Sequence, residues 1–390
     1  MRCQINSKTS LIEEVLLGCS IQEAPRLIPG ILLVLGIVAA AILVADWLNE
    51  AVGVTGVVSY ILVAIVFGMV VRNAFGLAPS LRLGVFFCIR KLLRLGIILL
   101  GIRFSIVDVA IIGVWGVPIV ISCISAGLLS TIYLTRLLRL SYRLGTLIAI
   151  GTSICGASAI VAAAPTIEAS DEEVTYAIAN ITIFGLIAMV VYPYVAKVLF
   201  DGNLVQIGLF IGTAIHETAQ VAGAGLIYDQ SFNISEKPSV TDIAVVIKLI
   251  RNLMMVLVIP AMAFLYAQRT LVREKSSGRS FREILNLAPV FIIGFLLAAI
   301  TRSIGDTNLY NGHLAFGLWN TVDWLIMCNG IKELSGYVLS MAMAGVGLST
   351  SFAAVKGLGI KPFAVGLISA TMVGATSVVS VLILGPLVKI

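Results

Sequence analysis

Two basic residues occur where charge is unfavourable. Lys248, Arg251 and Asn252 interrupt the apolar run of residues 243–265, and their spacing of i, i+3 and i+4 puts them on one face of a predicted helix. Cations that line a cavity favour an anionic ligand, and the guanidinium fork of an arginine fits the oxygens of an oxyanion. We therefore expect these three residues to bind an anionic substrate. For Lys248, the alternative is a side chain that extends to the membrane surface.

His216 and Glu217 form a second ionisable group inside an apolar stretch. At 1.5 Å per residue they lie about 20 Å into the helix predicted there, a depth at which ionisable residues of membrane proteins are rare and usually functional. We expect both to contribute to the same substrate site, and Glu217 to pair with Arg251 because a buried carboxylate needs a partner. The alternative is a hydrogen-bonded contact that only joins helices.

The segment around His216 resembles a protease motif without completing it. His216-Glu217-Thr218-Ala219-Gln220 differs from the HExxH of zinc metalloproteases because Gln220 replaces the second histidine. The other histidine, His313, falls in a predicted outer loop, so the pair of histidine ligands is absent from the sequence. The chain also has no P-loop motif. We therefore expect no enzymatic activity, no metal and no cofactor, and we count Gln220 as a substrate-binding candidate.

Two segments of small and polar residues interrupt apolar runs of membrane length. One is Gly151–Ser158, in the middle of residues 147–166, and the other starts with Ile211–Ile215, which repeats the pattern of Ile150–Ile154. Broken helices are tolerated at membrane depth where their backbone groups line a cavity, and such helices hold substrates in transporters. The further substrate-binding candidates from these segments are Thr152, Ser153, Gly156, Ser158 and Thr213.

The composition excludes a soluble protein. Of the 390 residues, 59% are hydrophobic and 12% are charged, and the mean hydropathy is +1.07, whereas soluble domains are about 45–50% apolar. The chain is therefore predicted to be an all-α polytopic membrane protein that is surrounded by the lipid bilayer. Its net charge of +6 follows from lysines and arginines in cytoplasmic loops, so we expect no nucleic-acid partner.

Apolar runs of about 20 residues predict about 11 transmembrane helices. Lysines and arginines gather in every second loop, for example Arg136, Arg139 and Arg143, and the loops between them are acidic, for example Glu168–Glu173. By the positive-inside rule, the N-terminus lies in the cytoplasm, and the C-terminus lies outside if the eleventh helix spans fully. We expect residues 1–28 to be a cytoplasmic N-terminal extension, and residues 29–390 to form a single transmembrane transporter domain.

The chain also contains a longer internal repeat. Seven residues between Gly101 and Ala126 recur 244 residues later without a gap, which relates residues of about 91–130 to about 335–374. The two copies have opposite orientations in the predicted topology, and inverted repeats with broken helices are typical of transporters. Chance is the alternative, because small residues are common in packed membrane helices. The shorter repeat at residues 150 and 211 cannot be inverted if both segments span once, so these segments are either parallel or one is re-entrant.

Several ordered motifs resemble a known family. These are the segments 91–103 (KLLRLGIILLGIR), 151–158 (GTSICGAS), 216–221 (HETAQV), 248–255 (KLIRNLMM) and 341–348 (MAMAGVGL). They closely resemble motifs of the YeiH-type sulfate exporter family, and the similarity extends from about Pro29 to the C-terminus. The resemblance implies a bacterial inner-membrane carrier with inverted repeats and broken helices.

Together these features predict a secondary transporter that moves a small anion, of the sulfate or organic sulfonate class, across the cytoplasmic membrane by alternating access. The alternatives are an ion-coupled carrier of another organic solute and a channel or membrane receptor. The sequence leaves open the substrate, the direction of transport, the coupling ion, H⁺ or Na⁺, and whether the chain forms a homo-oligomer.

Overall fold

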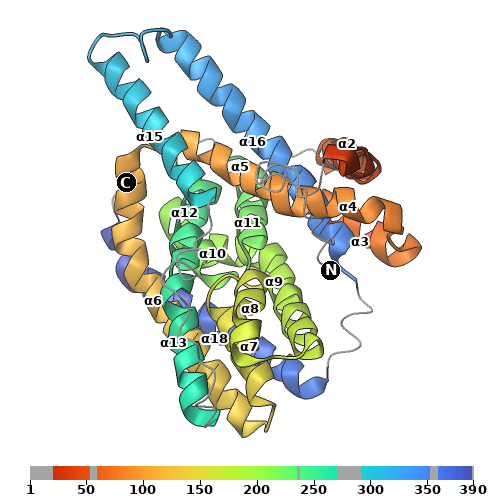
Figure 1. Ribbon diagram of the computed structural model, residues 1–390. Coiled ribbons are helices and arrows are strands. Elements are labelled where there is room, and N and C mark those ends of the chain that lie inside the picture. Colours follow the sequence, from red (N-terminus) through yellow and green to blue (C-terminus); the bar gives the residue numbers. More distant parts are fainter. Residues whose placement is uncertain (1–20, 53–58, 235–237, 271–290, 352–358, 389–390) are drawn as a thin grey trace. The chain divides into compact units, whose positions relative to one another are not determined.

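The computed structural model describes residues 21–52, 59–234, 238–270, 291–351 and 359–388 (Figure 1). Every element in these ranges is a helix, apart from an isolated β-bridge between Ala315 and Trp319. Five helical stretches are long and apolar enough to cross a membrane, namely Glu23–Ala51, Ile106–Leu137, Asp171–Leu199, Val240–Met262 and Ile360–Leu387. The prediction of an all-α membrane protein is therefore confirmed.

The predicted N-terminal extension is covered only in part. Residues 1–20 lie outside the described ranges, and residues 21–27 form the 3-10 helix η1 (Ile21–Leu27), which leads directly into α2 (Ile28–Val52). The start of the transporter domain, predicted at residue 29, thus coincides with the start of a long apolar helix.

The chain divides into two compact units. In unit 1, α2 buries a stripe of apolar side chains at Val34, Ile37, Val38, Ala41 and Ala45. This helical spacing packs α2 against the helices that follow it. Besides η1 and α2, the elements of unit 1 are α3 (Tyr60–Phe75), α4 (Pro79–Phe87), the π-helical turn η2 (Cys88–Leu92), α5 (Leu93–Leu100), η3 (Gly101–Arg103), most of α15 (Phe291–Tyr310), and α16 (Thr321–Ser349).

Unit 2 holds the segments that carry the candidate site. Its elements are α6 (Ile106–Leu137), α7 (Tyr142–Ser153), α8 (Ala157–Ala163), η4 (Ala164–Ile167), α9 (Asp171–Leu199), α10 (Leu204–Ala214), α11 (Thr218–Ser231, apart from its last residues), α12 (Val240–Leu253), α13 (Met255–Thr270), α18 (Ile360–Leu384) and η5 (Gly385–Leu387).

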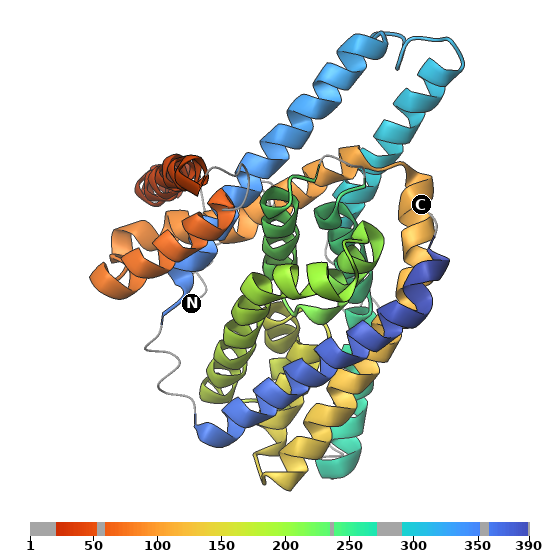
Figure 2. The ribbon, with the colours of Figure 1, turned by 180° about the vertical axis from the view of Figure 1, so that it is seen from behind.

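The two long helices α6 and α18 lie side by side and antiparallel in unit 2 (Figure 1, Figure 2). The hydroxyls of Ser122 and Ser380 are 2.9 Å apart, and the Thr131 hydroxyl donates to that of Ser369 at 2.8 Å. Because Ser122 precedes Thr131 while Ser380 follows Ser369, the helices run in opposite directions. α6 belongs to the first copy of the predicted repeat and α18 to the second.

The preceding helices of the two copies also pair, in unit 1. The Ser335 hydroxyl of α16 donates to the Gly96 carbonyl of α5 at 2.8 Å, while Gly345 lies against Ile89. α16 therefore runs antiparallel to the η2–α5 segment. Each copy thus contributes one helix to unit 1 and one to unit 2, although residues 352–358 of the second copy lie outside the described ranges.

Residues 142–167 fold back on themselves and form a helical hairpin, hairpin 1. Its first limb is α7 and its second limb is α8 with η4. Ser141, which caps the start of α7, donates a hydrogen bond at 2.5 Å to Glu173 in the first turn of α9. The chain therefore leaves hairpin 1 at the end where it began.

Residues 204–231 form a second hairpin, hairpin 2, from α10 and α11. Both limbs pack on the same turn of α12, because a Cβ on Gly208 would lie 2.6 Å from that of Ile243 and a Cβ on Gly225 would lie 2.6 Å from the Cα of Thr241. At the base, the Asp229 carboxylate accepts hydrogen bonds from the backbone N–H groups of Val240 and Thr241, at 3.0 and 3.1 Å.

The hairpins point at each other from opposite ends of unit 2. The base of hairpin 1 lies beside the C-terminal end of α6, where Gly145 contacts Thr135, and the base of hairpin 2 lies beside the C-terminal end of α18, where Gln206 contacts Gly385. Since α6 and α18 are antiparallel, these ends are opposite. The sequence predicted a spanning helix for each segment, with a re-entrant path for one of them as an alternative. Both segments form hairpins in the structure, so the number of eleven spans is not confirmed.

Candidate functional site

The two hairpin tips meet beside α12. Residues 154–156 form the tip of hairpin 1 and residues 215–217 the tip of hairpin 2. Each tip begins where its first limb ends, at Ser153 and at Ala214. The repeated phrases Ile150–Ile154 and Ile211–Ile215 therefore occupy equivalent positions. A helix that ends leaves its last carbonyl groups without partners inside the helix, so each tip presents buried acceptors.

Arg251 supplies donors to both tips. Its Nε donates to the Ser153 carbonyl at 2.9 Å and its Nη2 to the Thr152 carbonyl at 2.5 Å, while Nη1 donates to the carbonyls of Thr213 and Ile215 at 2.6 and 3.1 Å. Arg251 is fully buried. The guanidinium therefore holds the C-terminal ends of α7 and α10 together, where the negative end of a helix dipole favours a cation.

Lys248 repeats this role one turn earlier. Its Nζ donates to the carbonyls of Ile154 at 2.9 Å, of Ile215 at 3.0 Å and of His216. The side chain is fully buried, so the alternative that Lys248 extends to the membrane surface is wrong. The spacing of i and i+3 places Lys248 and Arg251 on one face of α12, as predicted.

These bonds occupy most of the cationic donors. An ammonium has three N–H donors and a guanidinium has five, and the structure directs three bonds from Lys248 and four from Arg251 to backbone carbonyls. The sequence predicted that these donors bind an anion. In this structure they bind helix ends, so an anion gains direct contact with Lys248 only by replacing a carbonyl.

Glu217 joins the tips without pairing to Arg251. Its Oε1 accepts a hydrogen bond at 3.3 Å from the backbone N–H of Ala157, at the start of α8. The described residues show no Glu217–Arg251 ion pair, so the predicted pair is not formed here. The reason is that the free carbonyls at the helix ends satisfy Arg251. The Glu217 side chain is half-buried.

Gly156 gives the tip of hairpin 1 its shape. Its φ of +69° is unfavourable for residues with a side chain. A Cβ at this position would also lie 2.4 Å from Cγ of Glu217. Gly156 therefore permits both the turn of hairpin 1 and the close approach of Glu217.

Three buried polar atoms around the tips have no hydrogen-bond partner: Ser153 Oγ, His216 Nδ1 and Asn252 Oδ1. All three side chains are at least 98% buried. Unsatisfied buried polar groups are unfavourable and usually indicate a missing water, ion or ligand. They lie where the hairpin tips meet α12, a contact that we call the joint (residues 152–157, 213–217 and Lys248, Arg251 and Asn252), and they can form hydrogen bonds with a solute.

The other candidates differ in their contacts and in their exposure. Thr152 contributes its carbonyl, as described above. The Thr213 hydroxyl pairs with that of Ser377 at 2.6 Å, and Gln220 bonds the Thr182 carbonyl at 3.2 Å and the Glu217 N–H at 3.3 Å. Ser158 is exposed on α8. The structure therefore brings the candidates together, and Ser158 is the exposed residue among them.

Two contributors were missed by the sequence analysis. Ser377 of α18 contacts Thr213, and the Thr218 hydroxyl accepts from Asn252 Nδ2 at 3.0 Å. Thr218 stands beside Glu217 in the sequence and could have been found by this adjacency. Ser377 could not, because one hydroxyl among many small residues carries no signal. In the described part of the chain, no group of three histidine, cysteine or acidic residues could hold a metal ion.

The sequence profile of the family described as conserved hypothetical protein 698 matches residues 29–366. A UPF0324 membrane protein of Bacillus anthracis is 33% identical over 356 residues, which cover 91% of this chain and 94% of the relative. The corresponding values are 32% over 313 residues, 80% and 85%, for a UPF0324 membrane protein of Bacteroides thetaiotaomicron, and 31% over 351 residues, 87% and 89%, for one of Pseudomonas aeruginosa.

Proposed function

The chain belongs to the conserved hypothetical protein 698 family, whose members named above are UPF0324 membrane proteins, and we propose that it is a secondary transporter. Its substrate is a small anion of the sulfate or organic sulfonate class, and it works by alternating access. The family membership confirms the resemblance to YeiH-type proteins. The chain is a membrane protein, and we place it in the cell inner membrane with a cytoplasmic N-terminus.

One observation carries this proposal: two hairpins from opposite ends of unit 2 meet at a joint of buried charged and polar groups. Substrate sites of inverted-repeat transporters lie near the bilayer midplane, between discontinuous helices. Two hairpins that approach from opposite ends can close such a site from both sides. The antiparallel pairs α5–α16 and α6–α18 support the inverted repeat of residues 91–130 and 335–374 within one transporter domain.

The charge of the joint favours an anion. Lys248 and Arg251 contribute +2 and Glu217 contributes −1, so the formal sum is +1. An entering oxyanion offers the cations the same kind of acceptor as the carbonyls at the tips. When it replaces the carbonyls of one hairpin, the tip of that hairpin loses its hydrogen bonds to α12 while the other tip remains bound. Substrate binding is thereby coupled to the opening of one hairpin at a time.

Glu217 provides a place for ion coupling. It is the half-buried acidic residue of the joint and contacts hairpin 1 through Ala157. Binding of H⁺ or Na⁺ to its carboxylate would weaken this contact between the tips. We propose no enzymatic activity and no cofactor, and a homo-oligomer is compatible with this scheme.

A second candidate has one observation in its favour. Since all three donors of Lys248 are bound to carbonyls, the remaining polar atoms, Ser153 Oγ, His216 Nδ1 and Asn252 Oδ1, suit a neutral or zwitterionic organic solute as well. An ion-coupled carrier of such a solute is therefore the alternative.

A thermal-shift screen separates the two candidates. Purified protein is heated with a panel of oxyanions, sulfonates and uncharged organic solutes of similar size. The proposal predicts that a tetrahedral oxyanion or a sulfonate raises the melting temperature, and that Arg251→Gln removes this response while Arg136→Gln, an exposed control on α6, keeps it. Stabilisation by uncharged solutes alone would support the alternative carrier.

A further inference from the structure

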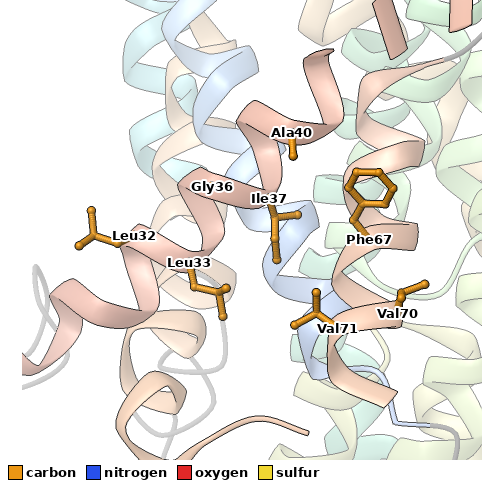
Figure 3. A pocket seen from close by; sticks show the side chains of 8 residues that line it. All are labelled: Leu32, Leu33, Gly36, Ile37, Ala40, Phe67, Val70 and Val71. Atoms are coloured by element: carbon orange, nitrogen blue, oxygen red, sulfur yellow. The ribbon is translucent and has the colours of Figure 1, made fainter. Parts of the chain in front are cut away.

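An apolar groove lies between α2 and α3 in unit 1 (Figure 3). It has a volume of about 430 Å³, within the range of small-molecule sites. Its lining comprises five residues of α2 from Leu32 to Ala40, together with Phe67, Val70 and Val71 of α3. Leu33, Ile37 and Val71 lie between the two helices (Figure 3).

Gly36 opens the groove. A Cβ added at Gly36 would meet no atom within 4 Å, whereas one at Gly30, on the same helix, would lie 2.3 Å from the Leu81 carbonyl oxygen. Gly30 therefore serves the packing of α2 on α4, and Gly36 serves no packing contact. The missing side chain leaves space that an apolar chain can fill.

Two arginines outside the lining lie near the residues at one end of the groove in the sequence. Arg72 directly follows Val71, is partly exposed, and forms no ion pair with the described residues. Arg26 precedes Leu33 by seven residues, which is about two helical turns. Its side chain is 72% exposed, and its contact with Glu23 is 3.7 Å long, so that pair is weak. Two guanidinium groups are therefore available where α2 begins and α3 ends.

We propose that this groove binds an anionic phospholipid, with an acyl chain along Gly36 and the phosphate at Arg72 and Arg26. A basic pocket between transmembrane helices suits an anionic headgroup, and guanidinium groups bind phosphate oxygens with charge-assisted hydrogen bonds. Under the proposed orientation the end near these arginines faces the cytoplasm, where the inner leaflet supplies such lipids. The groove itself does not depend on that orientation.

The test uses the full chain in detergent, with phosphatidylglycerol and phosphatidylcholine of identical acyl chains as probes. Native mass spectrometry measures how much of each lipid stays bound. The wild type is expected to retain phosphatidylglycerol at least tenfold better than phosphatidylcholine. Gly36→Leu adds a side chain at a position where a Cβ meets no atom within 4 Å, and it should lose at least tenfold of that retention. Arg72→Gln should bring the ratio of the two lipids towards one.

Gly336→Leu is the matched control, because a Cβ at Gly336 on α16 also meets no atom within 4 Å. It should bind lipid like the wild type. If Gly36→Leu does not fold, Val70→Trp fills the groove from α3, at a position that is 56% exposed. Unchanged retention in a folded groove-filling variant, or equal retention of both lipids by the wild type, would overturn the proposal. If the wild type is a dimer, and Gly36→Leu dissociates it while lipid retention stays unchanged, the groove binds a second copy of the chain instead of a lipid.

Discussion

The Ser141 hydroxyl donates a 2.5 Å hydrogen bond to the Glu173 carboxylate. If residues 147–166 crossed the membrane, these two residues would lie on opposite faces, about 30 Å apart. Their contact shows that hairpin 1 returns to its starting end. The sequence assigned the basic loop before hairpin 1 to the inside and the acidic loop after it to the outside, and this relationship places both loops on one side. Acidic residues influence membrane orientation little, so the acidic loop is compatible with the cytoplasmic side.

Labelling with a membrane-impermeant maleimide tests this topology. Single cysteines replace Arg136, before hairpin 1, Asp171, after it, and Asp201, between α9 and hairpin 2, and all three positions are exposed. We expect Arg136→Cys and Asp171→Cys to react from the same side, and Asp201→Cys from the other. The parent chain, whose described cysteines are buried, is the control. If Arg136→Cys and Asp171→Cys react from opposite sides, residues 147–166 span the membrane as the sequence predicted.

A side chain at Gly156 should block the joint. Gly156→Val combines backbone strain at positive φ, about 1–3 kcal/mol, with a Cβ only 2.4 Å from Glu217 Cγ. We expect the protein to insert but to lose transport. Gly330→Val on α16, where a Cβ meets no atom within 4 Å, should retain transport. Normal transport by Gly156→Val would show that the tip of hairpin 1 is not part of the substrate path.

Double-mutant cycles distinguish the partners of Arg251. Lys248 and Arg251 both donate to the Ile215 carbonyl, so Lys248→Met and Arg251→Met should be strongly non-additive in their effect on the melting temperature. Residues in one hydrogen-bond network couple by about 0.5–3 kcal/mol. Glu217→Gln with Arg251→Met should be closer to additive, because the two side chains do not pair. If Glu217→Gln and Arg251→Met were instead more strongly coupled than Lys248→Met and Arg251→Met, Glu217 and Arg251 would form an ion pair.

Ser153→Ala separates binding from stability. Its hydroxyl is buried without a partner, and removing an unsatisfied polar group is nearly neutral or stabilising. We therefore expect an unchanged or higher melting temperature without ligand, and a smaller shift with a ligand found in the anion screen. Ser122→Ala removes a bonded hydroxyl on α6 and should lower stability by about 1 kcal/mol while the ligand shift remains. An unchanged ligand response in Ser153→Ala would exclude its hydroxyl as a ligand.

Several features could be predicted from the sequence. The interruptions at Gly151–Ser158 and after Ile215, and the shared helix face of Lys248 and Arg251, follow from residue types and spacing. They locate the joint because charges and helix breaks are unfavourable in a membrane unless other groups compensate for them.

The path of the chain through the joint could not be predicted in the same way. Hairpin 1 covers residues 142–167, about the length of one spanning helix, so hydropathy does not distinguish a hairpin from a span. The partners of Arg251 were also hidden. They are backbone carbonyls that become available only where α7 and α10 end, and a sequence displays side chains but not free carbonyls.

The central claim is that a small anion crosses through the joint between the two hairpins. Its most direct test is counterflow of radiolabelled sulfate, or of the sulfonate that stabilises best, in liposomes that contain the purified protein. We predict uptake that saturates with substrate concentration, is accelerated by unlabelled substrate inside, and is lost in Arg251→Gln but kept in Arg136→Gln. Uptake that rises linearly and ignores internal substrate, or that persists in folded Arg251→Gln, would contradict this account.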